Sequence, residues 1–179
     1  MGAQTPETQG DSRHGGLIVA VGPLRIPDYL DRPQIVTRSG RNELTLSEFD
    51  RWGGSIENNI VRVLKEDLSA QLPPDRFFVI RWTPLIENQL PAAYRIQVLV
   101  NSFEGTPGGS VILRAQWGIF GKDKGVLFYK EASIVEQVNG NSYDALVDAM
   151  SKTLERLSLD IAEEVKVVVQ KDNEMRTKG

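Results

Sequence analysis

The stretch AYRIQVLVNSFEGTPGGSVILRAQWGIFGKDKGVLFYKEASIVEQV, residues 93–138, decides the fold that this chain is expected to adopt. It contains three β-prone runs, which are residues 93–105, 110–121 and 125–138. The links between them are too short to cross over to a parallel neighbour, so the runs are predicted to form an antiparallel meander. Alternate residues of the middle run form one apolar face, made of Val111, Leu113, Ala115, Trp117 and Ile119. The sheet is therefore expected to pack one face against a core and to leave the other partly solvated.

Two segments outside this stretch have the apolar spacing of amphipathic helices. The first stripe consists of Trp52, Ile56, Ile60, Leu64, Leu68 and Leu72. Ser47 and Asp50 have the spacing of a capping box, which predicts a helix start there, and Pro73 ends the helix. The second helix follows the N-cap candidates Asn141 and Ser142. Its stripe consists of Tyr143, Leu146, Met150, Leu154, Leu157, Ile161, Val165 and Val168.

Shorter β-prone runs lie before and after the first helix. They are residues 17–26, interrupted late by Gly22-Pro23, a hairpin of residues 35–38 and 43–46, and residues 76–82. Residues 83–91 are expected to form a loop. Together these elements predict an α+β fold, with a mostly antiparallel sheet of five to seven strands and two amphipathic helices packed on one face.

The length of 179 residues fits one domain. Residues 1–16 are polar and lack apolar periodicity, so they are expected to be a flexible leader. Residues 17–170 are predicted to form the single α+β domain, and the polar tail of residues 171–179 is expected to fray.

The composition excludes several kinds of site. A net charge of −3 gives no general reason to bind nucleic acid or an anionic membrane. The chain has no cysteine, which excludes disulfides, thiol catalysis and thiolate metal sites. Its one histidine, His14, lies in the leader, and neither a P-loop nor a dinucleotide-binding glycine pattern is present. No catalytic residue, metal site or cofactor is therefore predicted.

Carboxylate pairs and tryptophans are the remaining candidates for chemistry or ligand stacking. Glu66-Asp67 and Glu163-Glu164 lie largely off the apolar stripes, where solvated helix surfaces explain them. Trp52 and Trp117 belong to apolar faces and are expected in the core, whereas Trp82, at the end of a strand, is ambiguous. An enzyme that uses two facing carboxylates is therefore a weak alternative.

The segment PDYLDRP, residues 27–33, carries the most specific signal in the chain. Its two prolines fix φ and lack amide donors, which keeps them out of a central strand, and Leu30 is expected to reach the core. Two longer segments around it, VGPLRIPDYLDRPQIVTRSG and RWGGSIENNIVRVLKEDLSAQL, resemble the ABC-type transport auxiliary lipoprotein family. Gly53-Gly54 depart from that family's pattern, which has a small residue and then an acid after Arg-Trp.

The resemblance implies a non-enzymatic lipoprotein on the periplasmic side of the outer membrane. Such a protein would assist an ABC permease and a mammalian-cell-entry (MCE) domain protein that move lipids between the inner and outer membranes, by docking or scaffolding. The signal peptide and the lipid-bearing cysteine of the family are not in this chain, and the resemblance implies that they precede its polar leader.

Tyr29, Asp31 and Arg32 are the polar part of the family signature, and Arg51 and Trp52 open its second segment. We expect these residues either to lock the 27–33 segment in place or to present a docking surface for the partner, and we favour the lock. Two other functions stay open. A carrier of lipids or small hydrophobic ligands would need an apolar cavity of about 300 Å³. A self-assembling envelope module would form a homo-oligomer through exposed edge strands.

Overall fold

The computed structural model describes residues 16–40 and 43–178, with the side chains of 48–50 left out. The expected leader lies outside the described residues, apart from Gly16. The strands are β1 (Leu17–Arg25), β2 (Gln34–Arg38), β3 (Leu44–Arg51), β4 (Phe77–Arg81), β5 (Tyr94–Gly105), β6 (Ser110–Gly121) and β7 (Val126–Gln137). The helices are α1 (Ile56–Gln71), α2 (Pro84–Gln89) and α3 (Tyr143–Thr177).

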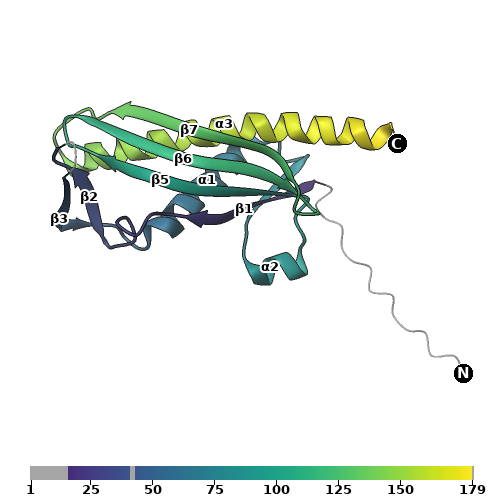
Figure 1. Ribbon diagram of the computed structural model, residues 1–179, viewed down its shortest axis with the longest axis horizontal. Helices are drawn as coiled ribbons and strands as arrows, with labels where there is room; N and C mark the ends of the chain where they lie inside the picture. The colour runs from purple at the N-terminus through teal and green to yellow at the C-terminus, as the bar shows by residue number, and fades with distance from the viewer. Residues whose placement is uncertain (1–15, 41–42, 179) are drawn as a thin grey trace, which may run out of the picture.

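Strands β5, β6 and β7 form the predicted antiparallel meander (Figure 1). Val98 pairs with Trp117, and Trp117 pairs in turn with Lys130, so the three strands are in register across the sheet. The whole predicted apolar face of β6 is buried, and Trp117 is 1% exposed. The alternation of apolar and polar residues therefore predicted correctly which side of the meander faces the core.

The rest of the sheet is mixed, which corrects the prediction of a mostly antiparallel sheet. β1 runs parallel to both β4 and β5, and β2 meets the far end of β5 in parallel, at Thr37 and Gly105. The β2–β3 hairpin is antiparallel as predicted. The parallel pairs join strands whose connections contain α1 or other long segments, and such connections allow a crossover.

β1 and β2 lie one after the other along the same edge of β5. β1 pairs with the first half of β5, up to Arg25 opposite Leu99, and β2 meets its last residue. Residues 27–33, called the connector below, leave the sheet edge between these two contacts. The connector therefore faces the second half of β5.

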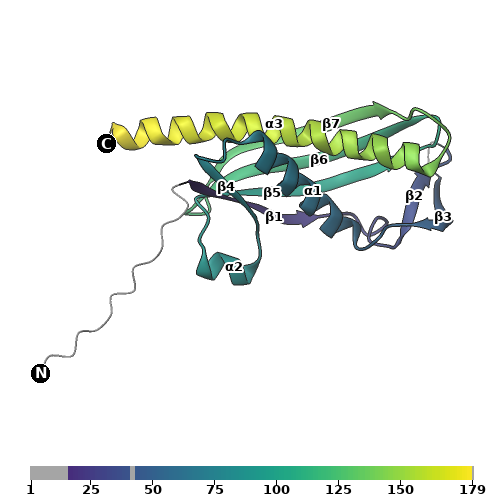
Figure 2. The same cartoon turned by 180° about the vertical axis from the view of Figure 1, so that it is seen from behind.

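Helices α1 and α3 both cover one face of the sheet, as predicted (Figure 2). The apolar stripe of α3 is buried from Leu146 to Val169, against α1 and strands β5, β6 and β7. α3 continues beyond the sheet and is helical to Thr177, through residues expected to fray (Figure 1). Asp172 in this part accepts a hydrogen bond from the Tyr94 hydroxyl (2.7 Å), which gives the helix a contact past its apolar stripe.

Two helix predictions were wrong. The Ser47 capping box does not start α1, because β3 continues to Arg51, which pairs with Gln34. Ser55 is the N-cap, and its side chain accepts a hydrogen bond from the Asn58 amide. The predicted loop over 83–91 contains α2, which Thr83 caps and Pro84 starts.

Candidate functional site

The connector is a compact turn that carries one buried side chain. The amides of Leu30 and Asp31 donate to the carbonyls of Pro27 and Asp28, at 2.9 and 3.2 Å. Leu30 is 1% exposed and belongs to the main core, as expected. The turn is therefore fixed to the domain by an apolar anchor at its centre.

The Tyr29 side chain makes the main polar contact of the connector, with Glu104 on β5. Its hydroxyl donates to Glu104 Oε2 at 2.6 Å, and Arg38 Nη2, at the end of β2, donates to Glu104 Oε1 at 2.5 Å. Glu104 is only 4% exposed. Burial, and then the hydrogen bond to this carboxylate, raise the pKa of Tyr29 well above its usual value. One buried carboxylate on β5 thus holds both the connector, through Tyr29, and the end of β2, through Arg38.

Trp52 meets the connector through its backbone. Its amide donates to the carbonyl of Pro33 at 2.7 Å, at the point where β3 ends. Its side chain is half-buried and packs against the core. The structure therefore brings Trp52 to the connector, and the expected core packing of its ring is partial.

The other three predicted residues lie near the same place with more exposed side chains. Asp31 and Arg51 are exposed. Arg32 is half-buried and lines a cleft of about 220 Å³ together with residues 54–56 at the start of α1. Its Nε is buried and has no hydrogen-bond partner among the described residues.

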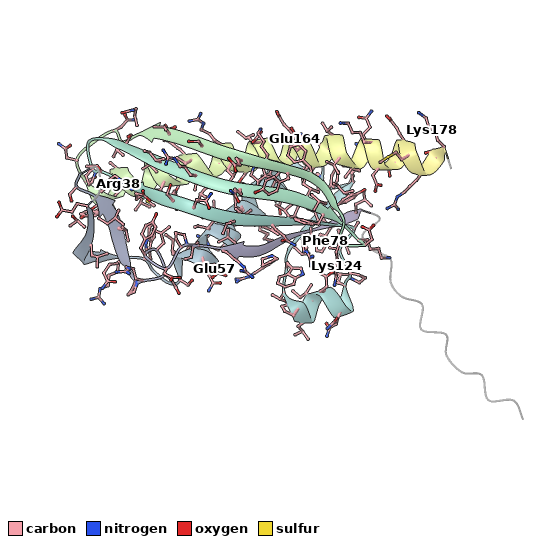
Figure 3. The ribbon with its side chains drawn as sticks, in the orientation of Figure 1. Arg38, Glu57, Phe78, Lys124, Glu164 and Lys178 are labelled. Atoms are coloured by element: carbon pink, nitrogen blue, oxygen red, sulfur yellow. The ribbon has the colours of Figure 1, made fainter. Side chains whose placement is uncertain are left out.

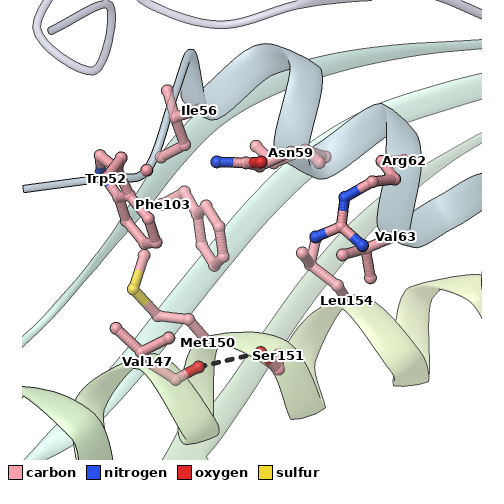
Figure 4. A pocket seen from close by; sticks show the side chains of 12 residues that line it. Trp52, Ile56, Asn59, Arg62, Val63, Phe103, Val147, Met150, Ser151 and Leu154 are labelled. Atoms are coloured by element: carbon pink, nitrogen blue, oxygen red, sulfur yellow. Dashed lines mark hydrogen bonds between the residues drawn. The ribbon is translucent and has the colours of Figure 1, made fainter. Parts of the chain in front are cut away.

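An apolar groove of about 270 Å³ lies between the first turns of α1 and α3, beside Trp52 (Figure 4). Its lining residues are Trp52, Gly53, Ile56, Asn59, Ile60, Arg62, Val63, Phe103, Val147, Met150, Ser151 and Leu154. Phe103 is next to Glu104 on β5, so the groove and the Tyr29–Glu104 pair share a strand. The sequence alone indicated neither Glu104 nor this groove as part of a site.

The carboxylates and Trp82 have structural contacts. Asp67 on α1 accepts a hydrogen bond from Ser158 on α3 at 3.1 Å, and burial is the main cause that raises its pKa. Glu66 pairs with Arg62 on the surface. Trp82 donates to Glu87 of α2 at 2.6 Å and lies under the guanidinium of Arg95. Asp67 and Trp82 therefore each join two parts of the fold, whereas Glu66 pairs within α1.

The described residues form neither a metal-binding cluster nor a membrane-spanning helix. In residues 16–40 and 43–178, no group of three or more His, Cys, Asp or Glu side chains is placed to hold a metal ion. Within the same part of the chain, no helix has the length and apolar character needed to cross a membrane.

Comparison with solved structures shows the fold. An uncharacterised protein of known crystal structure has a TM-score of 0.73 at 19% identity, over 83% of this chain and 92% of that one. A Xanthomonas campestris protein has a TM-score of 0.72 at 13% identity, over 89% of this chain and 88% of its own. A hypothetical protein of Chlamydia trachomatis has a TM-score of 0.51 at 12% identity, over 83% and 96%.

Comparison with sequences shows the family. No curated protein sequence matches the chain. The family model of the ABC-type transport auxiliary lipoprotein component matches residues 1–162, which include the connector, β3, α1 and the whole sheet. The chain therefore belongs to the ABC-type transport auxiliary lipoprotein component family.

Proposed function

We propose that this protein is a non-enzymatic, lipid-anchored periplasmic subunit of an ABC transport system that moves lipids between the inner and outer membranes. Its partners in this proposal are the ABC permease and an MCE-domain protein of the same system, which it docks or scaffolds from the outer membrane. The observation that carries the proposal is the family match over residues 1–162.

The geometry supports a division of labour among four of the five signature residues. Tyr29 is bonded to a buried carboxylate, and the Trp52 amide is bonded to Pro33, so both serve the lock. Asp31 is exposed at the neighbouring cleft, Arg51 is exposed just before Trp52, and the exposed Arg62 lines the apolar groove itself. A half-open apolar groove next to exposed charges has the composition of a protein docking surface, with an apolar centre and a polar rim.

The test is co-purification from membranes that contain the full-length lipidated protein with its natural partners. We expect the permease and the MCE-domain protein to be captured together with it. A Val147→Glu variant places a charge in the groove at a half-buried position, so we expect it to fold and to lose the partners. Val135→Glu is the matched control, because Val135 is 48% exposed on β7, away from the groove. The absence of both partners from the wild-type capture would contradict the proposal.

A second candidate function is direct carriage of a lipid or of another small hydrophobic ligand. The groove favours it, since about 270 Å³ of apolar space approaches the smallest usual ligand cavity. Native mass spectrometry of the protein purified from membranes distinguishes the two functions. A bound lipid that Val147→Trp displaces supports carriage, and a protein without lipid that still captures its partners supports docking alone.

A further inference from the structure

Helix α2 is attached to the domain by polar contacts and exposes its apolar side chains. The structure buries none of its six residues, and Leu85 is 68% exposed. The contacts that hold it are the Trp82–Glu87 hydrogen bond, the ion pair of Glu87 with Arg95 at 3.9 Å, and the Thr83 cap. Leu90, just after the helix, is 39% exposed. Core packing therefore does not explain the leucines in α2 and just after it.

The neighbouring turn between β6 and β7 adds more exposed apolar surface at the same end of the sheet. Tyr94, where the chain returns from α2, pairs with Gly121 at the start of this turn. Val126 and Leu127 follow the turn and are 62% and 39% exposed. Figure 3 labels Lys124, in the turn, at the same end of the sheet as α2. The exposed apolar side chains of α2 and of the β6–β7 turn, and the lysines of the turn, thus belong to the same end of the sheet.

The polypeptide also enters the described fold at this end. The Leu17 amide donates to the Arg76 carbonyl at 2.8 Å, and Leu17 pairs with Phe77, at the start of β1 and β4. In a lipoprotein the lipid is attached to the N-terminal residue, so the bilayer lies on the side from which the polypeptide enters the domain. The fifteen residues of this sequence that precede Gly16 span at most about 50 Å.

We propose that this end of the domain is a second membrane contact, in which Leu85, Leu90 and the β6–β7 turn rest on the lipid surface. Exposed leucines can enter the interface between headgroups and acyl chains, and Lys122 and Lys124 can approach anionic headgroups. Two acidic groups nearby have intramolecular partners: Asp123 accepts from the Gly125 amide, and Glu87 accepts from Trp82. The contact is weak alone and becomes effective when an anchor holds the domain near the bilayer.

This contact would set the orientation of the whole domain. The groove is lined by residues 147–154 of α3, about 20 residues before Asp172, which contacts Tyr94 beside the β6–β7 turn. At 1.5 Å per residue, the groove then lies roughly 30 Å from the membrane end. The docking surface proposed above would therefore be directed away from the outer membrane. The membrane contact itself does not depend on that docking function.

A cysteine-free sequence permits a direct test with single labels. Leu85→Cys and Leu46→Cys each carry an environment-sensitive nitrobenzoxadiazole dye. The full chain is held by an N-terminal histidine tag on vesicles of 3:1 phosphatidylethanolamine and phosphatidylglycerol with a nickel-chelating lipid. Leu46 is the control, because it is 41% exposed in β3 at the opposite end. We expect the dye emission to rise at least about twofold and shift to the blue at position 85, and to stay unchanged at position 46.

A flotation assay of the tagged chain, with a limiting amount of the nickel-chelating lipid, provides the second measurement. We expect Leu85→Ser with Leu90→Ser to lower vesicle binding at least about fivefold relative to the wild type. The matched pair Leu44→Ser with Leu46→Ser, also exposed, leaves it unchanged. No change in the dye at position 85, as for a surface that binds a protein, would overturn the proposal, and so would equal changes at both positions. The vesicles contain no transporter, so these outcomes are independent of the co-purification test.

Discussion

At the scale of single residues, the Glu104 carboxylate explains the form of the connector. A buried carboxylate is costly unless hydrogen bonds compensate for its lost hydration. Tyr29 supplies one of these bonds from within the connector, and Arg38 supplies the other from the end of β2. The Tyr29 hydroxyl therefore has a structural role, and no catalytic or ligand-binding role is needed to explain it.

This role predicts a stability change for Tyr29→Phe. The variant keeps the ring but removes the hydroxyl that Glu104 accepts from, so we expect the free energy of unfolding to fall by about 1.5–3 kcal/mol. Urea unfolding measures it. Tyr129→Phe is the matched control, because Tyr129 is 56% exposed, and we expect its change to stay within about 0.5 kcal/mol. Equal effects of the two substitutions would show that Tyr29 contributes no special bond.

A second tyrosine predicts a pH dependence. Burial, followed by the hydrogen bond to Asp172, raises the pKa of Tyr94 to about 12. An unfolded tyrosine has a pKa of about 10, so the stability from this hydroxyl is complete below pH 10 and is lost as the pH rises toward 12. We expect Tyr94→Phe to be less stable than the wild type at pH 8 by about 1–2 kcal/mol, and the difference to shrink by pH 11. Unfolding curves at both pH values measure it, and a constant difference would contradict the assignment.

The sequence could predict Leu30 as the anchor of the connector, but it could not predict Glu104. The two flanking prolines and a lone leucine are local signals. The Tyr29–Glu104 contact joins residues 75 positions apart, and nothing near Glu104 indicates that its side chain is covered. Polar contacts between distant segments depend on the fold as a whole, and this limited the prediction of the candidate site.

At the scale of elements, the apolar patterns predicted the meander and both long helices but not all of the connections. Periodicity identifies a buried face and does not depend on strand direction, so it could not distinguish parallel from antiparallel neighbours for β1. The start of α1 was misplaced because Ser47 satisfied a four-residue pattern inside a strand. Gly53-Gly54, followed by Ser55, contained the better signal, since glycines interrupt β structure and serine caps helices.

The glycines before α1 lead to an element-scale prediction. A Cβ at Gly54 would meet no atom within 4 Å, and its φ is not positive. We expect Gly54→Ala to raise the free energy of unfolding by about 0.4–1 kcal/mol, because it reduces the entropy of the unfolded chain. Gly108→Ala is the contrasting variant. Its φ is +73°, and its Cβ would lie 2.1 Å from the Asn141 side chain, so we expect a loss of about 1–3 kcal/mol. Thermal unfolding of both proteins tests this difference, and a loss at Gly54 would mean that the helix start needs glycine.

At the scale of the whole molecule, the two ends of the domain have different features. One end carries the β2–β3 hairpin, the connector and the groove, and the other carries the chain entry and α2. α3 runs along the domain between them (Figure 2). A protein that connects a membrane to a partner needs two such separate surfaces on a rigid body, and α3 packed along the sheet provides the rigidity.

The predicted domain boundary at residue 170 can be tested by shortening α3. A chain that ends at Gln170 keeps every buried residue of the helix, the last of which is Val169, and loses only contacts such as the Tyr94–Asp172 hydrogen bond. We expect it to unfold cooperatively with a melting temperature lower by about 3–8 °C.

A chain that ends at Leu157 also loses Ile161, Val165, Val168 and Val169 from the core. Each buried aliphatic side chain contributes about 2–5 kcal/mol, and a domain has only about 5–15 kcal/mol in total, so we expect no cooperative transition. Circular dichroism during heating measures both, and an unfolded Gln170 chain would place residues 171–177 inside the folding unit.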